Sequence, residues 1–209
     1  MAGTTSPAMT MEREREPPAS VEPTDIVKCW RNVMSVVSDD IAPLTFTFQD
    51  DGLVPNNPMP FLVYKGAVDV ENGHPEKTIE GLFGANGWGD MWRNGVYDYL
   101  HYHATVHEAL GVARGHARVR FGGNRGQEIE VEAGDVAILP AGTGHQCLTA
   151  SADFSVVGAY PPGARMHVTR PTPENHAKAL QTIPQVKLPK SDPVLGENGL
   201  LVRLWEHKS

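Results

Sequence analysis

The sequence has little cysteine and no long hydrophobic run. Its two cysteines, Cys29 and Cys147, lie far apart among 209 residues, so no disulfide framework is indicated and a reducing compartment is the default. No apolar run approaches the roughly 20 residues that a membrane-spanning helix needs. The first 25 residues lack the apolar core of a signal peptide and contain acidic residues, which transit peptides avoid. We therefore expect a cytoplasmic protein that does not bind a membrane.

Basic residues are also in the minority. The chain has 18 Lys and Arg against 25 Asp and Glu, a formal net charge of −7. Nucleic-acid surfaces need clustered Lys and Arg to bind phosphates, so a nucleic-acid partner is not expected. A small anionic substrate is not excluded, because one arginine and a metal ion can bind a carboxylate locally.

Large apolar residues are scarce in residues 1–25, which are rich in Pro, Ser, Thr and Glu. Such a segment cannot bury enough surface to offset the entropy of ordering, and we expect a disordered tail. The length favours a single domain over residues 26–209. Its first segment, Ile26–Ser38, fits either a short helix or a strand.

Short β-rich runs separated by Gly-rich turns recur every 8–12 residues in the second half of the chain. This spacing is typical of an antiparallel sandwich or barrel, and places an all-β core at about residues 95–160. The expected strands are Leu44–Gln49, Phe61–Tyr64, YDYLHYH (Tyr97–His103), HEALGV, HARVRF, EIEVE, VAILP, HQCLTA and FSVVGAY.

Four further segments, besides these strands, are expected to have a defined structure. Glu76–Asn86 has apolar residues at helical spacing, and His176–Thr182 reads as a short helix that begins near Pro173. The Pro-punctuated segment Ile183–Gly199 is expected to be an extended arm. Leu200–Trp205 is predicted to be a closing strand.

Histidines are concentrated near one expected strand. Of nine histidines, four fall between residues 101 and 116. Residues two apart in a strand face the same way, so His101 and His103 should project side by side. Glu108 follows after a short connection, and His145 begins the strand after the PAGTG turn. In a small barrel all four side chains can point inward at one level.

Three imidazoles and a carboxylate inside an apolar barrel are costly to leave unpaired, and a divalent cation removes that cost. Nitrogen and oxygen donors suit iron, manganese, nickel, copper or zinc. The alternative is that these histidines are ordinary surface residues on strands.

Two further residues are candidates for catalysis. Tyr99 shares the parity of His101 and His103, so it either lines the pocket or is a core aromatic. His107 faces away from Glu108 if the strand is regular, which favours a structural or supporting role. If the strand is bulged, His107 instead replaces His101 as a ligand.

Two spaced patterns resemble the two motifs of the cupin superfamily. They are Gly95-x5-His101-x-His103-x4-Glu108-x6-Gly115 and Gly134-x5-Pro140-x-Gly142-x2-His145. One departure is Thr149, where the second motif commonly has Asn; this position is not a metal ligand in the family pattern. Segments such as NGWGDMWRNGVYDYLHYHATVHE also resemble a group of short single-barrel bacterial and fungal cupins, most of which have no assigned function.

The resemblance implies a double-stranded β-helix, or jelly-roll barrel, with short terminal helices and arms. It implies one divalent metal ion on His101, His103, Glu108 and His145, a small-molecule substrate and a homodimer. Because a three-His, one-Glu site resembles that of many small cupin dioxygenases, an Fe(II) dioxygenase is favoured, with His107 or Tyr99 moving protons. The alternatives are an isomerase, decarboxylase or lyase that uses Mn, Ni or Zn as a Lewis acid, or a non-catalytic binder of small molecules. Copper is a further possible metal ion.

Overall fold

The structure, a computed structural model, describes residues 41–71, 73–163 and 165–206. Its strands form a six-stranded sheet, in the order β1-β2-β7-β4-β9-β3, and a three-stranded sheet, in the order β6-β5-β8. The predicted tail (1–25) and the segment Ile26–Ser38 lie outside the described residues. The strands are β1 (Leu44–Phe46), β2 (Phe61–Tyr64), β3 (Gly89–Asn94), β4 (Glu108–Arg114), β5 (His116–Phe121), β6 (Gln127–Glu132), β7 (Val136–Leu139), β8 (His145–Ala150) and β9 (Ser155–Tyr160).

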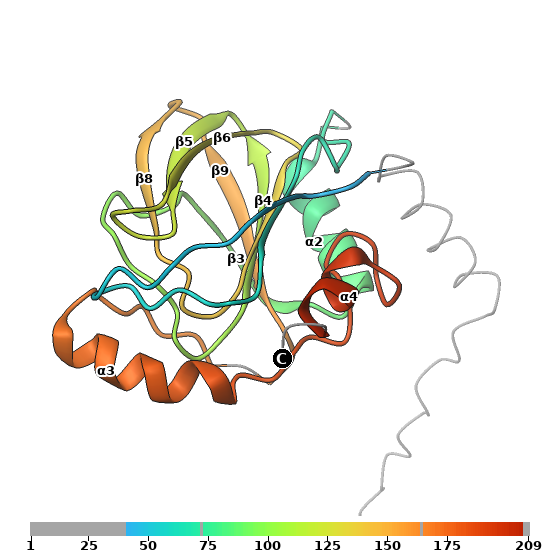
Figure 1. Ribbon diagram of the computed structural model, residues 1–209. Helices are drawn as coiled ribbons and strands as arrows, with labels where there is room; N and C mark the ends of the chain where they lie inside the picture. Colours follow the sequence, from blue (N-terminus) through green and yellow to red (C-terminus); the bar gives the residue numbers. More distant parts are fainter. Residues whose placement is uncertain (1–40, 72, 164, 207–209) are drawn as a thin grey trace, which may run out of the picture.

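The two sheets face each other across a hydrophobic core (Figure 1). Alternation along β4 decides which side chains enter it: Leu110 and Val112 point between the sheets, whereas Ala109 and Ala113 point outward. All pairings between the named strands are antiparallel. The predicted all-β fold, built from facing antiparallel sheets, is therefore confirmed. The sheets also include β1, β2 and β3, which precede residue 95.

A second hydrophobic layer covers the outer face of the six-stranded sheet. Helix α2 (Pro75–Ala85) buries Ile79, Leu82 and Phe83 there, and its bounds agree closely with the predicted Glu76–Asn86. The segment after residue 186 adds Val194 to the same layer. This layer supports the sheet from behind, on the side away from the barrel interior.

The prediction of a closing strand at Leu200–Trp205 is wrong. The segment forms helix α4 (Leu200–Glu206), which packs into this outer layer. Leu201 and Trp205 are four residues apart and both buried, so they share one helical face. The short apolar run LLVRLW has no periodicity that separates a helix from a strand.

The region around the predicted strand YDYLHYH also differs from expectation. The strand in this part of the sheet lies earlier in the sequence than predicted: it is β3, which pairs with β9. Within YDYLHYH only His101 and Tyr102 make isolated β-bridges, to His145 and Thr169. The segment therefore runs along the end of the barrel as an irregular connection.

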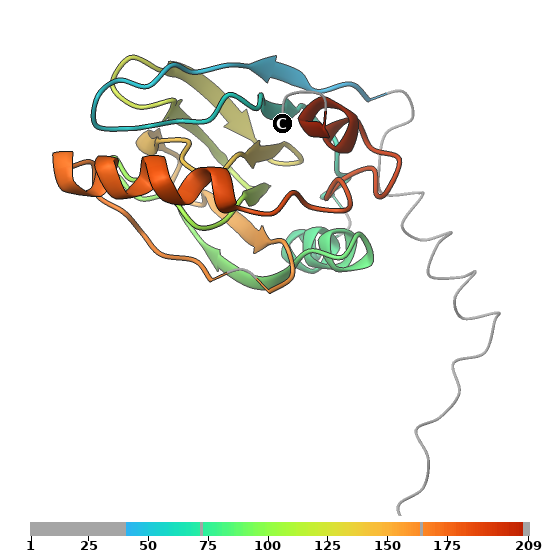
Figure 2. The ribbon, with the colours of Figure 1, turned by 60° about the horizontal axis from the view of Figure 1, so that its bottom comes forward.

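Helix α3 (Pro173–Thr182) crosses this end of the barrel (Figures 1 and 2). It begins at the predicted proline, with the Thr172 hydroxyl accepting a hydrogen bond from the Asn175 backbone N–H, and a 3-10 turn, η1 (Ile183–Gln185), follows it. Buried Tyr102 packs with Ala179 of α3 in a small third cluster. Among the described residues, no helix is both long and apolar enough to cross a membrane.

Candidate metal centre

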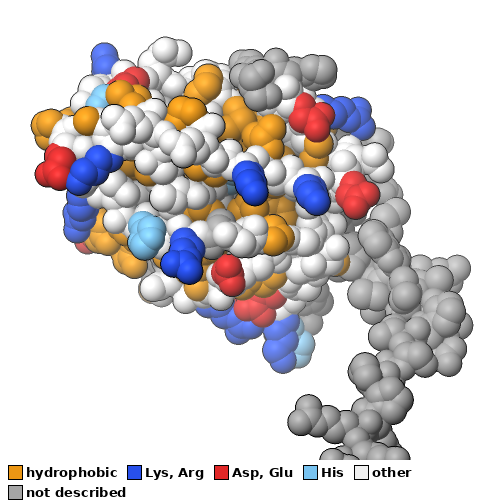
Figure 3. All heavy atoms as spheres, turned by 90° about the horizontal axis from the view of Figure 1, so that it is seen from below, with side chains coloured by type: hydrophobic (Ala, Val, Ile, Leu, Met, Phe, Trp, Pro, Cys, Tyr) orange, Lys and Arg blue, Asp and Glu red, His pale blue; other side chains and the backbone are white. Residues whose placement is uncertain are grey.

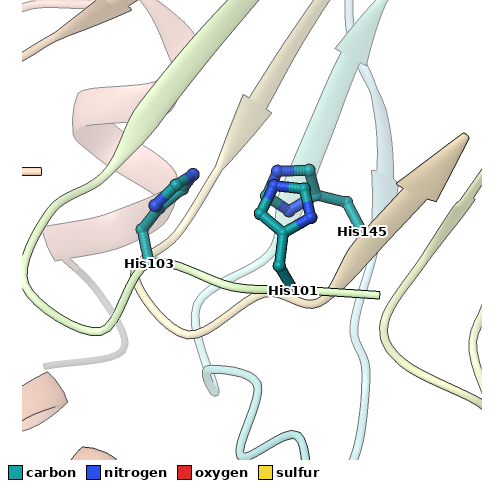
Figure 4. A group of neighbouring side chains, drawn as sticks. All are labelled: His101, His103 and His145. Carbon is teal, nitrogen blue, oxygen red and sulfur yellow. The ribbon is translucent and has the colours of Figure 1, made fainter. Parts of the chain in front are cut away.

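Three buried histidines converge at the end of the barrel that α3 crosses. His101 and His103 lie on the connection between β3 and β4, and His145 is the first residue of β8. The His145 N–H donates to the His101 carbonyl at 2.9 Å, and the reverse hydrogen bond is 3.2 Å. This pairing brings the two rings to a centroid separation of 4.0 Å. One ligand atom of each histidine lies within 4.8 Å of the others, and the three rings point toward a common space (Figure 4).

Each imidazole is oriented by a backbone carbonyl. The Nδ1 atoms of His101, His103 and His145 lie 3.0, 2.9 and 3.1 Å from the carbonyl oxygens of Tyr99, His167 and Thr143. A carbonyl only accepts, so Nδ1 carries the proton and the Nε2 lone pair is left for the shared space. Metal-binding histidines are held in the same way.

Glu108 brings a carboxylate to the same space from the start of β4. Its Oε2 atom lies 3.4 Å from His103 Nε2 and 3.5 Å from His145 Nε2. The side chain is buried and Oε2 has no hydrogen-bond partner. A buried carboxylate oxygen without a hydrogen-bond partner is costly, and a divalent cation between it and the imidazole nitrogens would remove that cost. The three nitrogens and one oxygen therefore fit a metal ion.

Electrostatics keep most of these groups in the forms that bind a metal. Burial alone would raise the pKa of Glu108, but the surrounding histidines hold it at about 2. Burial lowers the pKa of His145 to about 3 and also lowers that of His101. Burial likewise opposes charge on His103, yet the Glu108 carboxylate outweighs it and raises the His103 pKa. Among these candidate ligands, His103 is therefore the one at which protons would compete most strongly with a metal.

A two-step hydrogen-bond chain holds Glu108. The Tyr160 hydroxyl donates to Glu108 Oε1 at 3.2 Å, and the Trp92 indole N–H donates to Tyr160 at 2.7 Å. Trp92 pairs with Gly158, where an added Cβ would lie 2.1 Å from the indole. Only glycine leaves room for that ring. These hydrogen bonds engage the Oε1 atom of Glu108, so its Oε2 atom is left facing the histidines.

Replacing Tyr160 by phenylalanine should weaken metal binding without removing a ligand. Loss of an orienting partner of this kind typically lowers metal affinity by roughly 10- to 100-fold. Competition with a chromophoric chelator would measure the change, with Thr149→Val, which removes an exposed hydroxyl near the end of β8, as the control. Unchanged affinity in Tyr160→Phe would show that the packing around Glu108 holds it without the hydroxyl.

The turn Pro140–Gly144 delivers His145, and it is tied to the rest of the site. The Gly142 N–H donates to the His103 carbonyl at 2.7 Å. Gly142 has φ 92°, and a Cβ there would lie 2.6 Å from the Asn56 carbonyl oxygen. The buried Asn57 side chain donates to the Ala141 carbonyl at 2.9 Å. One turn thus fixes both His103 and His145.

His107 belongs to this support and does not reach the three histidines' shared space. Its Nδ1 accepts a hydrogen bond from the Ala141 N–H at 3.0 Å, and its ring lies 4.7 Å from that of Trp205. Burial lowers its pKa to about 4, so the imidazole is neutral at pH 7. His107 points into the outer layer, as expected for a regular strand, and we assign it a positioning role on the turn.

Two tyrosines and an arginine lie beside His101. The rings of Tyr97 and Tyr99 stack at 4.8 Å, and their centroids lie 5.2 and 5.4 Å from that of His101. The Arg170 guanidinium carbon lies 3.3 Å from the centre of the Tyr99 ring. The parity argument thus placed Tyr99 next to the ligands, although its segment is not a strand.

Several residues of the site have no counterpart in the sequence predictions. Trp92 and Tyr160 were missed as a pair because the expected strands did not include β3. Asn56 and Asn57 lie in no expected element, although asparagines between prolines are typical of a turn. No spacing in the sequence connects Arg170 with His101.

Comparisons with known proteins identify one curated relative. No family model matches the chain. The chain is 37% identical over 162 residues to YjlB, an uncharacterized protein of Bacillus subtilis, covering 77% of this chain and 95% of that protein.

Solved structures give weaker similarity. An acireductone dioxygenase from Bacillus anthracis, with a cadmium ion in its active centre, is 17% identical with a TM-score of 0.30, covering 72% of this chain and 87% of that chain. A DUF861 family protein from Thermotoga maritima is 20% identical with a TM-score of 0.28, covering 47% and 93%. TM-scores this low carry no conclusion about activity. The identity and coverage of the Bacillus subtilis relative do decide the family, and the chain belongs to the family of YjlB.

Proposed function

We propose that the protein is a metal-dependent oxidoreductase of the Fe(II) dioxygenase type that acts on a small molecule. The carrying observation is the buried Glu108 Oε2, which has no hydrogen-bond partner and faces the Nε2 atoms of His103 and His145. His101 completes the donor set. These side chains would hold the ion, with Glu108 as the fourth ligand.

Four protein ligands leave one or two positions on a five- or six-coordinate ion for exogenous molecules. When bound, Fe(II) would supply redox chemistry with dioxygen, whereas Mn, Ni or Zn would act mainly as Lewis acids. The protein's own part is to orient the imidazoles through backbone carbonyls and to exclude water with the hydrophobic core between the sheets. Tyr99, beside His101, is the candidate for contact with a substrate.

The test begins with elemental analysis of protein purified without a His-tag. After anaerobic reconstitution with Fe(II), oxygen uptake would be followed with a panel of small chelating acids and diols. We expect about one iron per chain and oxygen uptake that requires both iron and a substrate. Glu108→Gln should lose both, whereas His116→Gln, on the exposed side of β5, should lose neither.

Two results would change the proposal in different ways. If the protein binds stoichiometric metal and turns over a substrate without oxygen, the proposed function becomes that of an isomerase, decarboxylase or lyase. Failure to bind any divalent metal would overturn metal dependence altogether.

We also propose a cytoplasmic location. The support is the scarcity of cysteine, together with the free thiol of Cys147.

A further inference from the structure

We propose that Arg170 is the anion-binding residue of the substrate site, and that the substrate is a small carboxylate-bearing chelator. This inference rests on the proposed metal function and names the substrate class for it. The observation that carries it is a guanidinium that stacks on the Tyr99 ring next to His101 and has no acidic partner among the described residues.

The backbone fixes Arg170 alongside the ligand segment. Thr169 and Tyr102 exchange two backbone hydrogen bonds of 2.9 and 3.1 Å. The His167 carbonyl holds His103 Nδ1, so residues 167–170 are tied to the ligands themselves. On the other side, the Asn175 side chain in the first turn of α3 donates to the Arg170 carbonyl at 2.9 Å. Arg170 therefore stands at a defined place beside the site.

Its side chain is held flat against an aromatic ring. The guanidinium carbon is 3.3 Å from the centre of the Tyr99 ring, and that ring is 5.4 Å from His101. Stacking of this kind orients a guanidinium while its N–H groups stay available at the edge. In the part of the chain that the structure describes, no carboxylate forms an ion pair with Arg170, and the residue is exposed.

Charge favours an anion at this position. Three neutral imidazoles and one carboxylate leave a site that holds a divalent cation with a net charge of +1, and Arg170 adds a second positive charge beside it. Glu108 lies against His103 and His145, whereas Arg170 lies on the His101 side. Figure 3 shows the molecule from below, the end that α3 crosses, where both basic and acidic side chains are exposed among hydrophobic ones. A carboxylate that reaches the ion would meet the guanidinium with a second oxygen.

The test compares an anionic and an uncharged ligand of the same metal site. The unsubstituted protein, Arg170→Gln and Arg170→Lys would be loaded with Co(II), whose visible absorption changes when a ligand enters. Oxalate is the chelating anion and imidazole the uncharged ligand. Arg118→Gln is the matched control, because Arg118 is an exposed arginine on β5 that pairs with Glu128.

We expect Arg170→Gln to weaken oxalate binding by roughly 10- to 100-fold, the range for a charge-assisted hydrogen-bond pair. Imidazole and Co(II) affinities should stay within about twofold, and Arg118→Gln should bind oxalate as the unsubstituted protein does. The oxalate affinity of Arg170→Lys should lie between those of the unsubstituted protein and Arg170→Gln, because lysine keeps the positive charge and lacks the planar guanidinium.

Equal oxalate affinity in Arg170→Gln would overturn the proposal, and so would an equal loss in Arg118→Gln. The proposed function fails separately, and at an earlier step: the unsubstituted protein would then take up no Co(II) before any anion is added.

Discussion

Replacement of His145 by alanine is expected to reduce the affinity for a divalent metal by more than the roughly 10- to 100-fold that loss of an orienting partner causes. His145 has the most constrained position of the ligands. It is buried, its backbone pairs with that of His101, and its Nε2 lies 3.5 Å from Glu108 Oε2. The substitution removes a donor and leaves Glu108 with one imidazole neighbour fewer.

The measurement is a competition titration with a chromophoric chelator, supported by elemental analysis of the purified variant. His116→Ala is the control, because it removes a histidine from the exposed side of β5. Metal at 100 times its dissociation constant should stabilise the unsubstituted protein by about 2.7 kcal/mol and leave His145→Ala almost unchanged. Full metal retention in His145→Ala would contradict the proposed ligand set.

The convergence of the candidate ligands was predictable from the sequence, although the strand predicted to carry His101 and His103 was wrong. His101 and His103 were paired by strand parity, and their segment turns out to hold only isolated bridges. The prediction survives because the bridge between His101 and His145 gives that segment local extended geometry, in which residues two apart still face the same way. His145 was predicted from its spacing to a proline and a glycine, and Gly142 indeed lies in the turn before it.

The surroundings of the ligands could not be predicted, because their contacts are long-range. Tyr160 reaches Glu108 across 52 residues of sequence, and Asn57 reaches Ala141 across 84. Such pairs follow from which strands are neighbours, and a single sequence does not show the order β4-β9-β3. The helix α4 was missed for a related reason. The apolar pattern of its short sequence fits a helix as well as a strand, and only the packing of Leu201 and Trp205 on the outer layer selects the helix.

Replacement of Trp205 by alanine is expected to lower the free energy of unfolding by about 3–5 kcal/mol, the range for removing a large aromatic side chain from a core. Trp205 is 1% exposed and lies in the outer layer with Leu201. Its indole N–H donates to the Pro60 carbonyl at 2.9 Å, immediately before β2. The substitution therefore opens a cavity and leaves a buried carbonyl without its donor.

Urea denaturation of the metal-free protein would measure this loss, and Arg203→Ala, on the exposed side of α4, is the control. A change below about 1 kcal/mol would show that α4 contributes little to the stability of the barrel.

The same variant tests whether packing in the outer layer affects metal binding. Trp205 packs on His107, and His107 accepts the Ala141 N–H of the turn that delivers His145. Metal affinity should therefore fall in Trp205→Ala, and by less than in His145→Ala, because the turn keeps its hydrogen bonds to His103 and Asn57.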